Sequence, residues 1–306
     1  MVRKTHIVTK KHGMILVSFI KGKQPPFIST ELDILLRIAP HQTNLLDSKK
    51  SAKRKTKIGY KEISANCVCV EKEIVRSKSF DDVMAEMIKE GKSIFWLDPT
   101  LIPTECLASI FTTWLHKTKS TTNLGLGVII PFSESTKFKT GNFKTWAPTS
   151  SRVLEKRVEE IKLPIWYPSL ACDPQYLREI ANSITFFDIF PVVEFPQIID
   201  YAAEKEIAAH HYMLDQYRTR TRNFIYLNNN SPTEALITLF ESFEAIPRGG
   251  KMPRSLVITP GGNPISYLVT LLAGVLAEGI FATAVGERPY SEARDTWGFA
   301  ILKKVD

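Results

Sequence analysis

A repeated pattern constrains the fold of this chain more than any other feature of the sequence. The pattern Pro-Thr-Glu-x-Leu-x-x-x-Phe occurs at residues 103–111 and again at residues 232–240. A second proline follows each pattern at the same distance, at Pro131 and at Pro260, so both landmarks have the same offset between the copies. A motif and a second landmark at one offset indicate an internal duplication.

Each copy reads as a strand, a helix and a second strand. Proline is favourable at the first position of a helix, and a glutamate two residues later interacts well with the positive helix N-terminus. In the second copy, Ser231 and Glu234 have the spacing of a capping box. The flanking runs are continuously apolar, which is typical of parallel strands covered on both faces. These expected strands are Ile94–Leu97, Gly127–Pro131, Phe224–Leu227 and Leu256–Pro260.

The rest of the chain continues the alternation of strands and helices. Further helices are expected at Phe80–Glu90, Ser151–Glu160, Gln197–Tyr217 and Pro264–Glu278. Further strands are expected at Met14–Ile20, Asn66–Val75, Ile280–Val285 and Trp297–Lys303. The predicted fold class is therefore α/β, with two tandem Rossmann-like units whose mostly parallel sheets are flanked by helices.

The predicted domain boundaries follow from this duplication. Prolines punctuate the chain between Thr145 and Pro174, which favours a connection there. The expected parts are an N-terminal strand and helix region at 1–78 with a basic loop at 47–61, a first Rossmann-like unit at 79–145, a proline-rich connection at 146–174 and a second unit at 175–306.

The basic charge is concentrated at one end of the sequence. Residues 1–62 hold 14 Lys and Arg against four Asp and Glu, a net charge of +10, and the rest of the chain carries −2. One interpretation is a solvated surface loop; the other is a contact with nucleic acid, because clustered cations release counterions from phosphates. The candidate contacts are Lys49, Lys50, Lys53, Arg54, Lys55 and Lys57.

Composition excludes several classes of protein. Hydrophobic residues make up 44% and charged residues 24%, which is typical of a globular chain and excludes wholesale disorder. The apolar stretch from Leu268 to Val285 contains Glu278, so a buried helix and strand are expected there and no membrane segment. Four cysteines and no N-terminal apolar leader favour a reducing compartment, and we expect a cytoplasmic protein with buried thiols.

The candidate ligand site lies where strands of the second copy end. Ligands of open parallel sheets bind at the carboxyl ends of strands, against helix N-termini. In Thr259-Pro-Gly-Gly-Asn263, two glycines lead into a helix whose free N–H groups would face an anion. The alternative is a tight turn without a ligand. The candidate residues here are Asn229, Ser231, Thr233, Glu234, Thr259, Gly261, Gly262 and Asn263.

Two further candidates follow the Ile280–Val285 strand, where Arg288 could pair with a phosphate and Tyr290 could stack on a base; a polar surface loop is the alternative.

No catalytic motif, metal-ligand spacing or cofactor fingerprint is present, so no catalytic residue, metal or cofactor is expected. Glu105 and Glu234 occupy equivalent places in the two copies. They could act together in acid–base chemistry, but helix capping explains both.

The turn Leu256-Val-Ile-Thr-Pro-Gly-Gly-Asn-Pro-Ile265 resembles the ligand turn of CARF domains, the Rossmann-like sensors of cyclic oligonucleotides in prokaryotic defence. Two such units in one chain are similar to SAVED domains, and the resemblance extends over residues 80–300 at the level of topology. It implies a nucleotide ligand and an effector domain. Because no effector domain is left over in the sequence, it also implies a separate partner protein.

The first functional hypothesis is a non-catalytic module that recognises a nucleotide or other phosphorylated ligand at the Thr259–Asn263 turn. The alternative is a subunit of a larger nucleic-acid-associated assembly, in which the basic N-terminal segment makes the contact and the Rossmann-like halves serve as scaffold. An enzyme using Glu105 and Glu234 is a third reading.

Overall fold

A computed structural model provides the structure of the chain. It describes residues 2–9, 12–21, 33–37, 58–63, 69–74, 89, 94–97, 99, 104–119, 124–132, 143–149, 153–195, 202–220, 223–247, 253–284 and 295–305. The chain forms two compact units. Unit 1 comprises Met1–Ser133, Thr149–Val153 and Arg288–Asp306, and unit 2 comprises Glu134–Pro148 and Leu154–Glu287.

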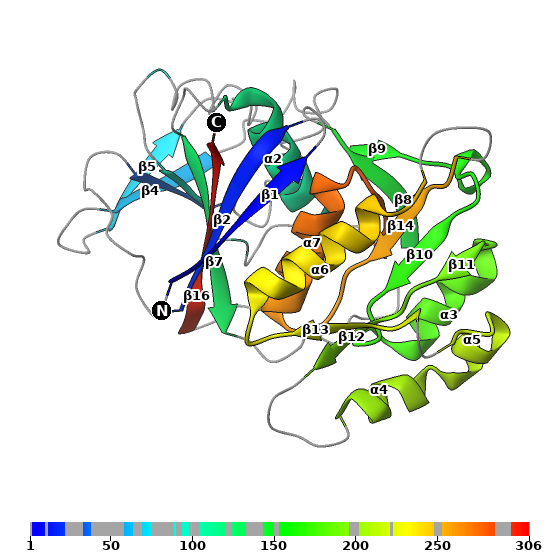
Figure 1. Ribbon diagram of the computed structural model, residues 1–306. Coiled ribbons are helices and arrows are strands. Elements are labelled where there is room, and N and C mark those ends of the chain that lie inside the picture. The colour runs from blue at the N-terminus through cyan, green and yellow to red at the C-terminus, as the bar shows by residue number, and fades with distance from the viewer. Residues whose placement is uncertain are drawn as a thin grey trace. The chain divides into compact units, whose positions relative to one another are not determined.

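Unit 1 contains a mixed sheet in the order β1-β2-β16-β7-β6-β3-β4-β5 (Figure 1). Its strands are β1 (Val2–Thr9), β2 (Gly13–Lys21), β3 (Asp33–Arg37), β4 (Ile58–Ile63), β5 (Cys69–Ile74), β6 (Ile94–Leu97), β7 (Gly125–Phe132) and β16 (Asp295–Val305). Helix α2 (Thr104–Lys117) connects β6 to β7, which pair in parallel. The carboxyl-terminal strand β16 pairs with β2 on one side and with β7 on the other, so it lies inside the sheet.

The prediction of a mostly parallel sheet is wrong for unit 1. Among the strand pairs that the structure describes there, only β3–β6 and β6–β7 are parallel. The pairs β1–β2, β3–β4 and β4–β5 are antiparallel, and successive antiparallel strands need no crossover connection. Of the basic loop expected at 47–61, residues 58–61 belong to β4, and the rest lies outside the described residues.

Unit 2 has a predominantly parallel sheet in the order β11-β10-β14-β15-β8-β9, and β12 and β13 form a parallel pair beside it. Its strands are β8 (Phe143–Pro148), β9 (Val153–Glu155), β10 (Ile165–Pro168), β11 (Asp188–Ile189), β12 (Val192–Phe195), β13 (Ile225–Asn228), β14 (Leu256–Thr259) and β15 (Ile280–Ala284). A parallel bridge between Ser169 and Val192 joins β12 to the edge of the larger sheet.

Helices connect these strands within the part of unit 2 that the structure describes (Figure 1). They are α3 (Pro174–Ser183), α4 (Ala202–Ala209), α5 (His211–Gln216), α6 (Pro232–Glu244) and α7 (Pro264–Leu276). The helix expected at 197–217 is interrupted at His210, so it forms the two helices α4 and α5. Every residue of α7 is buried, which explains why its sequence is apolar on all sides. The α/β fold class is confirmed.

The repeated pattern has the same element order in both places but different strand pairing. Glu105 and Glu234 each lie in the first turn of a helix, α2 and α6. In unit 1 the strands on either side of that helix, β6 and β7, are direct neighbours. In unit 2, β13 pairs with β12, whereas β14 pairs with β10 and β15. The α6 connection therefore passes over neighbouring strands, and two equivalent tandem units are not confirmed.

The domain ranges predicted from the sequence differ from the compact units. The regions expected at 1–78 and 79–145 share one sheet, because β3 pairs with β6. The region expected as a connection, 146–174, contributes β9 and β10 to the sheet of unit 2. The helix expected at Ser151–Glu160 is wrong: residues 153–155 form β9, and residues 158–160 form a 3-10 turn.

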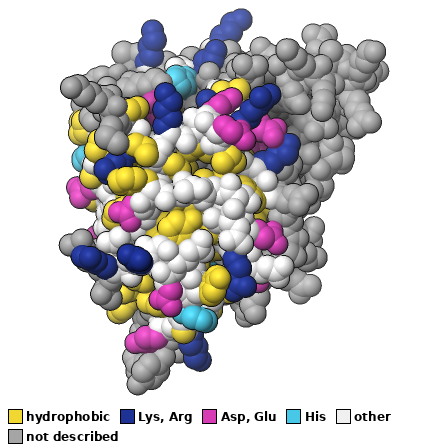
Figure 2. Space-filling model, turned by 90° about the vertical axis from the view of Figure 1, so that its right-hand side faces the viewer, with side chains coloured by type: hydrophobic (Ala, Val, Ile, Leu, Met, Phe, Trp, Pro, Cys, Tyr) yellow, Lys and Arg dark blue, Asp and Glu magenta, His cyan; other side chains and the backbone are white. Residues whose placement is uncertain are grey.

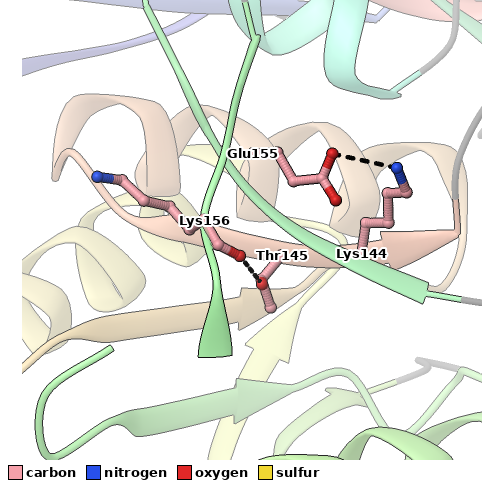
Figure 3. A network of polar contacts seen from close by, with 4 residues as sticks. All are labelled: Lys144, Thr145, Glu155 and Lys156. Atoms are coloured by element: carbon pink, nitrogen blue, oxygen red, sulfur yellow. Dashed lines mark hydrogen bonds and ion pairs between the residues drawn. The ribbon is translucent and has the colours of Figure 1, made fainter. Parts of the chain in front are cut away.

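The β8–β9 hairpin forms the antiparallel border of unit 2. The Thr145 hydroxyl donates to the Lys156 carbonyl at 2.5 Å, and Lys144 Nζ lies 3.1 Å from Glu155 Oε2 (Figure 3). On its other side β8 pairs antiparallel with β15. Because these polar contacts belong to the edge of the sheet, they stabilise its border, away from the connections that follow the parallel strands.

Among the described residues, no helix has the length and apolar character needed to span a bilayer.

Candidate functional site

The candidate site is the carboxyl edge of the parallel strands in unit 2. In chain order these strands are β10, then β11 and β12 as one interrupted strand, then β13, β14 and β15. Side by side they lie in the order β13, β11/β12, β10, β14 and β15. The third strand in the chain is thus followed by the second, the first, the fourth and the fifth. The order reverses between the neighbours β10 and β14, whose connections lead to α3 and α7 on opposite faces (Figure 1). Crevices at such a switch point are where open α/β sheets bind ligands.

A partly buried carboxylate, that of Glu194, lies at this edge. Glu194 follows the apolar start of β12, and its Oε1 accepts from the Asn263 backbone N–H at 2.6 Å. Its Oε2 accepts from the Asn263 side-chain amide at 2.9 Å and from Asn229 Nδ2 at 3.4 Å. One side chain of β12 thus joins the turns that follow β13 and β14. Sequence analysis did not single out Glu194; an acidic residue ending an apolar strand was the available signal.

Burial shifts the protonation of two carboxyl groups here. Loss of solvation raises the pKa of Glu194, against the lowering effect of its hydrogen bonds. Burial, with a smaller contribution from the nearby Glu194 charge, raises the pKa of Glu206 on α4 to about 7. The Glu206 carboxyl group accepts from the backbone N–H of Glu194, and its buried Oε2 has no hydrogen-bond partner within the described part of the chain. The two groups therefore interact across the end of β12.

The glycine pair of the Thr259–Asn263 turn has a packing role. Gly262 has φ +95°, and a Cβ atom there would overlap Glu194 Oε1. A Cβ atom at Gly261 would overlap Cys172 Sγ, which donates to the Pro260 carbonyl at 3.6 Å. Both glycines let buried side chains of neighbouring connections approach the turn.

The N-terminus of α7 is already satisfied by this chain. The Asn263 side chain accepts from the backbone N–H groups of Ile265 and Ser266, at 2.9 and 3.1 Å. The Asn263 N–H donates to Glu194, so a carboxylate of the protein occupies the position at which sequence analysis expected an external anion. The proposed contact of Thr259 also differs, because its buried hydroxyl accepts from the Trp166 indole at 2.9 Å.

The N-terminus of α6 is arranged differently. Ser231 is the N-cap residue, but its side chain forms no capping hydrogen bond, so the predicted capping box with Glu234 is wrong. Ser231 and Thr233 are 2% and 9% exposed, and neither hydroxyl has a partner within the described residues. Glu234, in the same turn, is exposed. Asn229 connects the two helix ends, since its Oδ1 accepts from the Ser266 hydroxyl at 2.5 Å.

A buried histidine holds the connection that follows β10. His210 Nε2 lies 2.8 Å from the Leu170 carbonyl oxygen, and burial lowers the pKa of the imidazole. Its Nδ1 is buried and has no partner in the described part of the structure. The lowered pKa favours the neutral imidazole, and the hydrogen bond to Leu170 positions the β10–α3 connection. No group of three or more His, Cys, Asp or Glu side chains that could hold a metal lies among the described residues.

Several sequence candidates cannot be placed at this site. Arg288, Tyr290 and the basic residues Lys49, Lys50, Lys53, Arg54, Lys55 and Lys57 lie outside the described residues. Glu105 belongs to unit 1 and Glu234 to unit 2. On the face shown in Figure 2, basic, acidic and hydrophobic side chains are interspersed over the described residues. Such mixing is typical of an ordinary solvated surface.

Replacing Asn229 with alanine is expected to lower the free energy of unfolding by about 1–2 kcal/mol, because Glu194 and Ser266 each lose a hydrogen bond at a part-buried position. Chemical denaturation measures the change. Asn230→Ala serves as the matched control, since Asn230 is exposed in the same turn and should shift stability by less than about 0.5 kcal/mol. Equal effects of the two substitutions would contradict the bridging role of Asn229.

Comparisons with known proteins add little to this geometry. No family model matches the chain, and no curated protein matches it. One solved structure to which the chain is similar is that of a universal stress protein from Pseudomonas aeruginosa UCBPP-PA14. The TM-score is 0.26 and the identity 10%, over 68% of each chain. A similarity of this size carries no argument about function.

Proposed function

We propose that unit 2 is a recognition module that binds a nucleotide or another phosphorylated ligand at the carboxyl edge of its parallel strands. The observation that carries the proposal is the reversal of strand order between β10 and β14. At that reversal two connections diverge, and polar side chains from β12 and from the connections after β13 and β14 converge beside them.

The side chains at this edge suit a ligand rich in hydroxyl and amide groups. Asn228 and Asn230 are exposed, while Asn229 and Asn263 are partly accessible and held by fixed hydrogen bonds. Amide groups both donate and accept, so they can bind the edges of a base or the hydroxyl groups of a ribose. Because Asn229 and Asn263 are already oriented by Glu194, the ligand would not have to order them.

The hydrogen bonds of the site agree with a module that binds a ligand without catalysing a reaction. Glu194 directs both carboxylate oxygens to N–H donors of the protein, and His210 bonds a backbone carbonyl. General acid–base catalysis requires a group that can reach the substrate's proton, and these two groups are directed elsewhere. The resemblance to CARF and SAVED domains suggests cyclic oligonucleotides as one ligand class and a separate effector protein as partner.

Calorimetric titration tests the proposal with linear mononucleotides and cyclic oligonucleotides as probes. Asn230→Trp places a bulky side chain at the exposed carboxyl edge, and we expect it to weaken binding at least tenfold. Thr185→Trp is the matched control, because Thr185 is exposed and precedes β11 at the amino edge. Absence of binding by every probe, or equal losses in the two variants, would overturn the proposed function.

A further inference from the structure

The two helices that begin at the carboxyl edge differ in what their N-termini can still bind. Helix α7 has an Asn263 cap, and the N–H group of Asn263 is bonded to the Glu194 carboxylate. An external phosphate that bound the Asn263 N–H group would lie next to the Glu194 carboxylate, which already accepts from that group. Like charges so close repel each other strongly in a partly buried site. The end of α7 is therefore unsuited to a phosphoryl group.

Helix α6 offers the opposite arrangement. It has 13 residues, and its N-cap side chain leaves the first turn uncapped. The hydroxyl groups of Ser231 and Thr233 are more than nine-tenths buried and without partners in the described residues. Side chains of a helix lean toward its N-terminus, so the Thr233 hydroxyl lies near the first-turn N–H groups. Buried hydroxyl groups normally find a partner, and two orphans in one turn require an explanation.

We propose that the phosphoryl group of the ligand binds at the N-terminus of α6, where it accepts from the hydroxyl groups of Ser231 and Thr233 and from first-turn N–H groups. This inference rests on the function proposed above and assigns the phosphoryl part of that site. A phosphate supplies the acceptors that two hydroxyl donors and a helix N-terminus lack. Glu194 and Asn263 then face the uncharged part of the same ligand, since Asn229 bonds Glu194 and lies two residues before Ser231.

Access to this subsite runs through the β13–α6 turn. Asn228 and Asn230 are exposed in that turn, and the buried Ser231 and Thr233 follow it in the sequence. The turn is held by hydrogen bonds from Ser231 N to the Asn228 carbonyl and from Asn230 N to Asn228 Oδ1. Binding therefore includes a local shift of the turn. Glu234 carries an exposed charge in the first turn of α6, and water screens its repulsion of a phosphate.

The test compares Thr233→Val and Ser231→Ala in titrations with the four ribonucleoside monophosphates and the four matching nucleosides. Each substitution should weaken binding of the bound monophosphate about tenfold to a hundredfold and leave binding of its nucleoside within twofold. Thr238→Val is the matched control on α6, because Thr238 is exposed, and it should change neither affinity.

Stability separates a binding role from a structural one. Removing a buried hydroxyl group that has no partner should leave the denaturation midpoint unchanged or raise it. A lowered midpoint together with equal losses for nucleotide and nucleoside would identify a structural role and overturn the inference. Monophosphate binding that both variants retain would overturn the inference and leave the proposed function standing. Absence of any nucleotide binding by the unsubstituted protein would overturn both.

Discussion

Gly262→Ala is expected to lower the free energy of unfolding by about 3–5 kcal/mol. Two effects add at this position. Gly262 has φ +95°, a conformation that alanine adopts only with strain, and the new Cβ atom would overlap the Glu194 carboxylate. The carboxylate cannot move aside without giving up its bonds to Asn263. Chemical denaturation followed by tryptophan fluorescence measures the loss.

Two controls separate these effects. Gly13→Ala places alanine at φ +73° in open space, so it reports the backbone strain alone and should cost only about 1–2 kcal/mol. Adding Glu194→Ala to Gly262→Ala removes the overlap. The double variant should therefore be more stable than the sum of the single losses predicts, by about 1–3 kcal/mol. Strict additivity would show that the carboxylate does not restrict Gly262.

The free energy of unfolding should fall by about 1–2 kcal/mol as the pH rises from the ordinary pKa of a glutamate to mildly alkaline values. Burial, and to a smaller extent the Glu194 charge, raises the pKa of Glu206 from 4.5 to about 7 in the folded protein. The folded state therefore holds a proton that the unfolded state has lost between these values. Its stabilising effect is complete below pH 4.5 and disappears above pH 7. Solvent screening of a half-buried group reduces the effect from the roughly 3 kcal/mol that linkage alone allows.

Glu206→Gln should reduce this pH dependence. Glutamine is neutral throughout and can still accept from the backbone N–H of Glu194, so the variant should exceed the unsubstituted protein in stability at about pH 8. The pKa of Glu194 is also raised by burial, so a slope of the same sign remains in the variant. Glu204→Gln on the same helix is the control, because Glu204 is exposed. A Glu206→Gln variant with the full slope would refute the assignment.

The sequence predicted best those elements whose local signals agree with their environment. The strands β7, β14 and β15 read as continuous apolar runs because helices and neighbouring strands enclose them. Helices α6 and α7 were recognisable from a proline at the first position after Ser231 and Asn263. Helix α3 carried the same signal, with Asp173 as cap and Pro174 next, but no helix was predicted there, and the predicted proline-rich connection ended at residue 174.

The parts that could not be predicted depend on contacts between distant residues. Glu194 and Asn263 lie far apart in the sequence, and no local pattern indicates that they bond. The same limit applies to strand pairing. The repeated motif predicts a strand, helix and strand in both copies, but it cannot tell whether the second strand lies beside the first or beyond other strands. For this reason the position of the Thr259–Asn263 turn was predicted, whereas the carboxylate that fills it was not.

The position of β16 inside its sheet has a consequence for how the protein is synthesised. β16 separates β2 from β7, and the register pairs Ile15 with Lys304, which come from opposite ends of the sequence. A nascent chain therefore exposes the inner edges of β2 and β7 until the ribosome has translated residues 295–305, by which time every strand of unit 2 has been made. Unit 2 can acquire its structure during translation, whereas unit 1 must wait, with two unpaired strand edges open to aggregation.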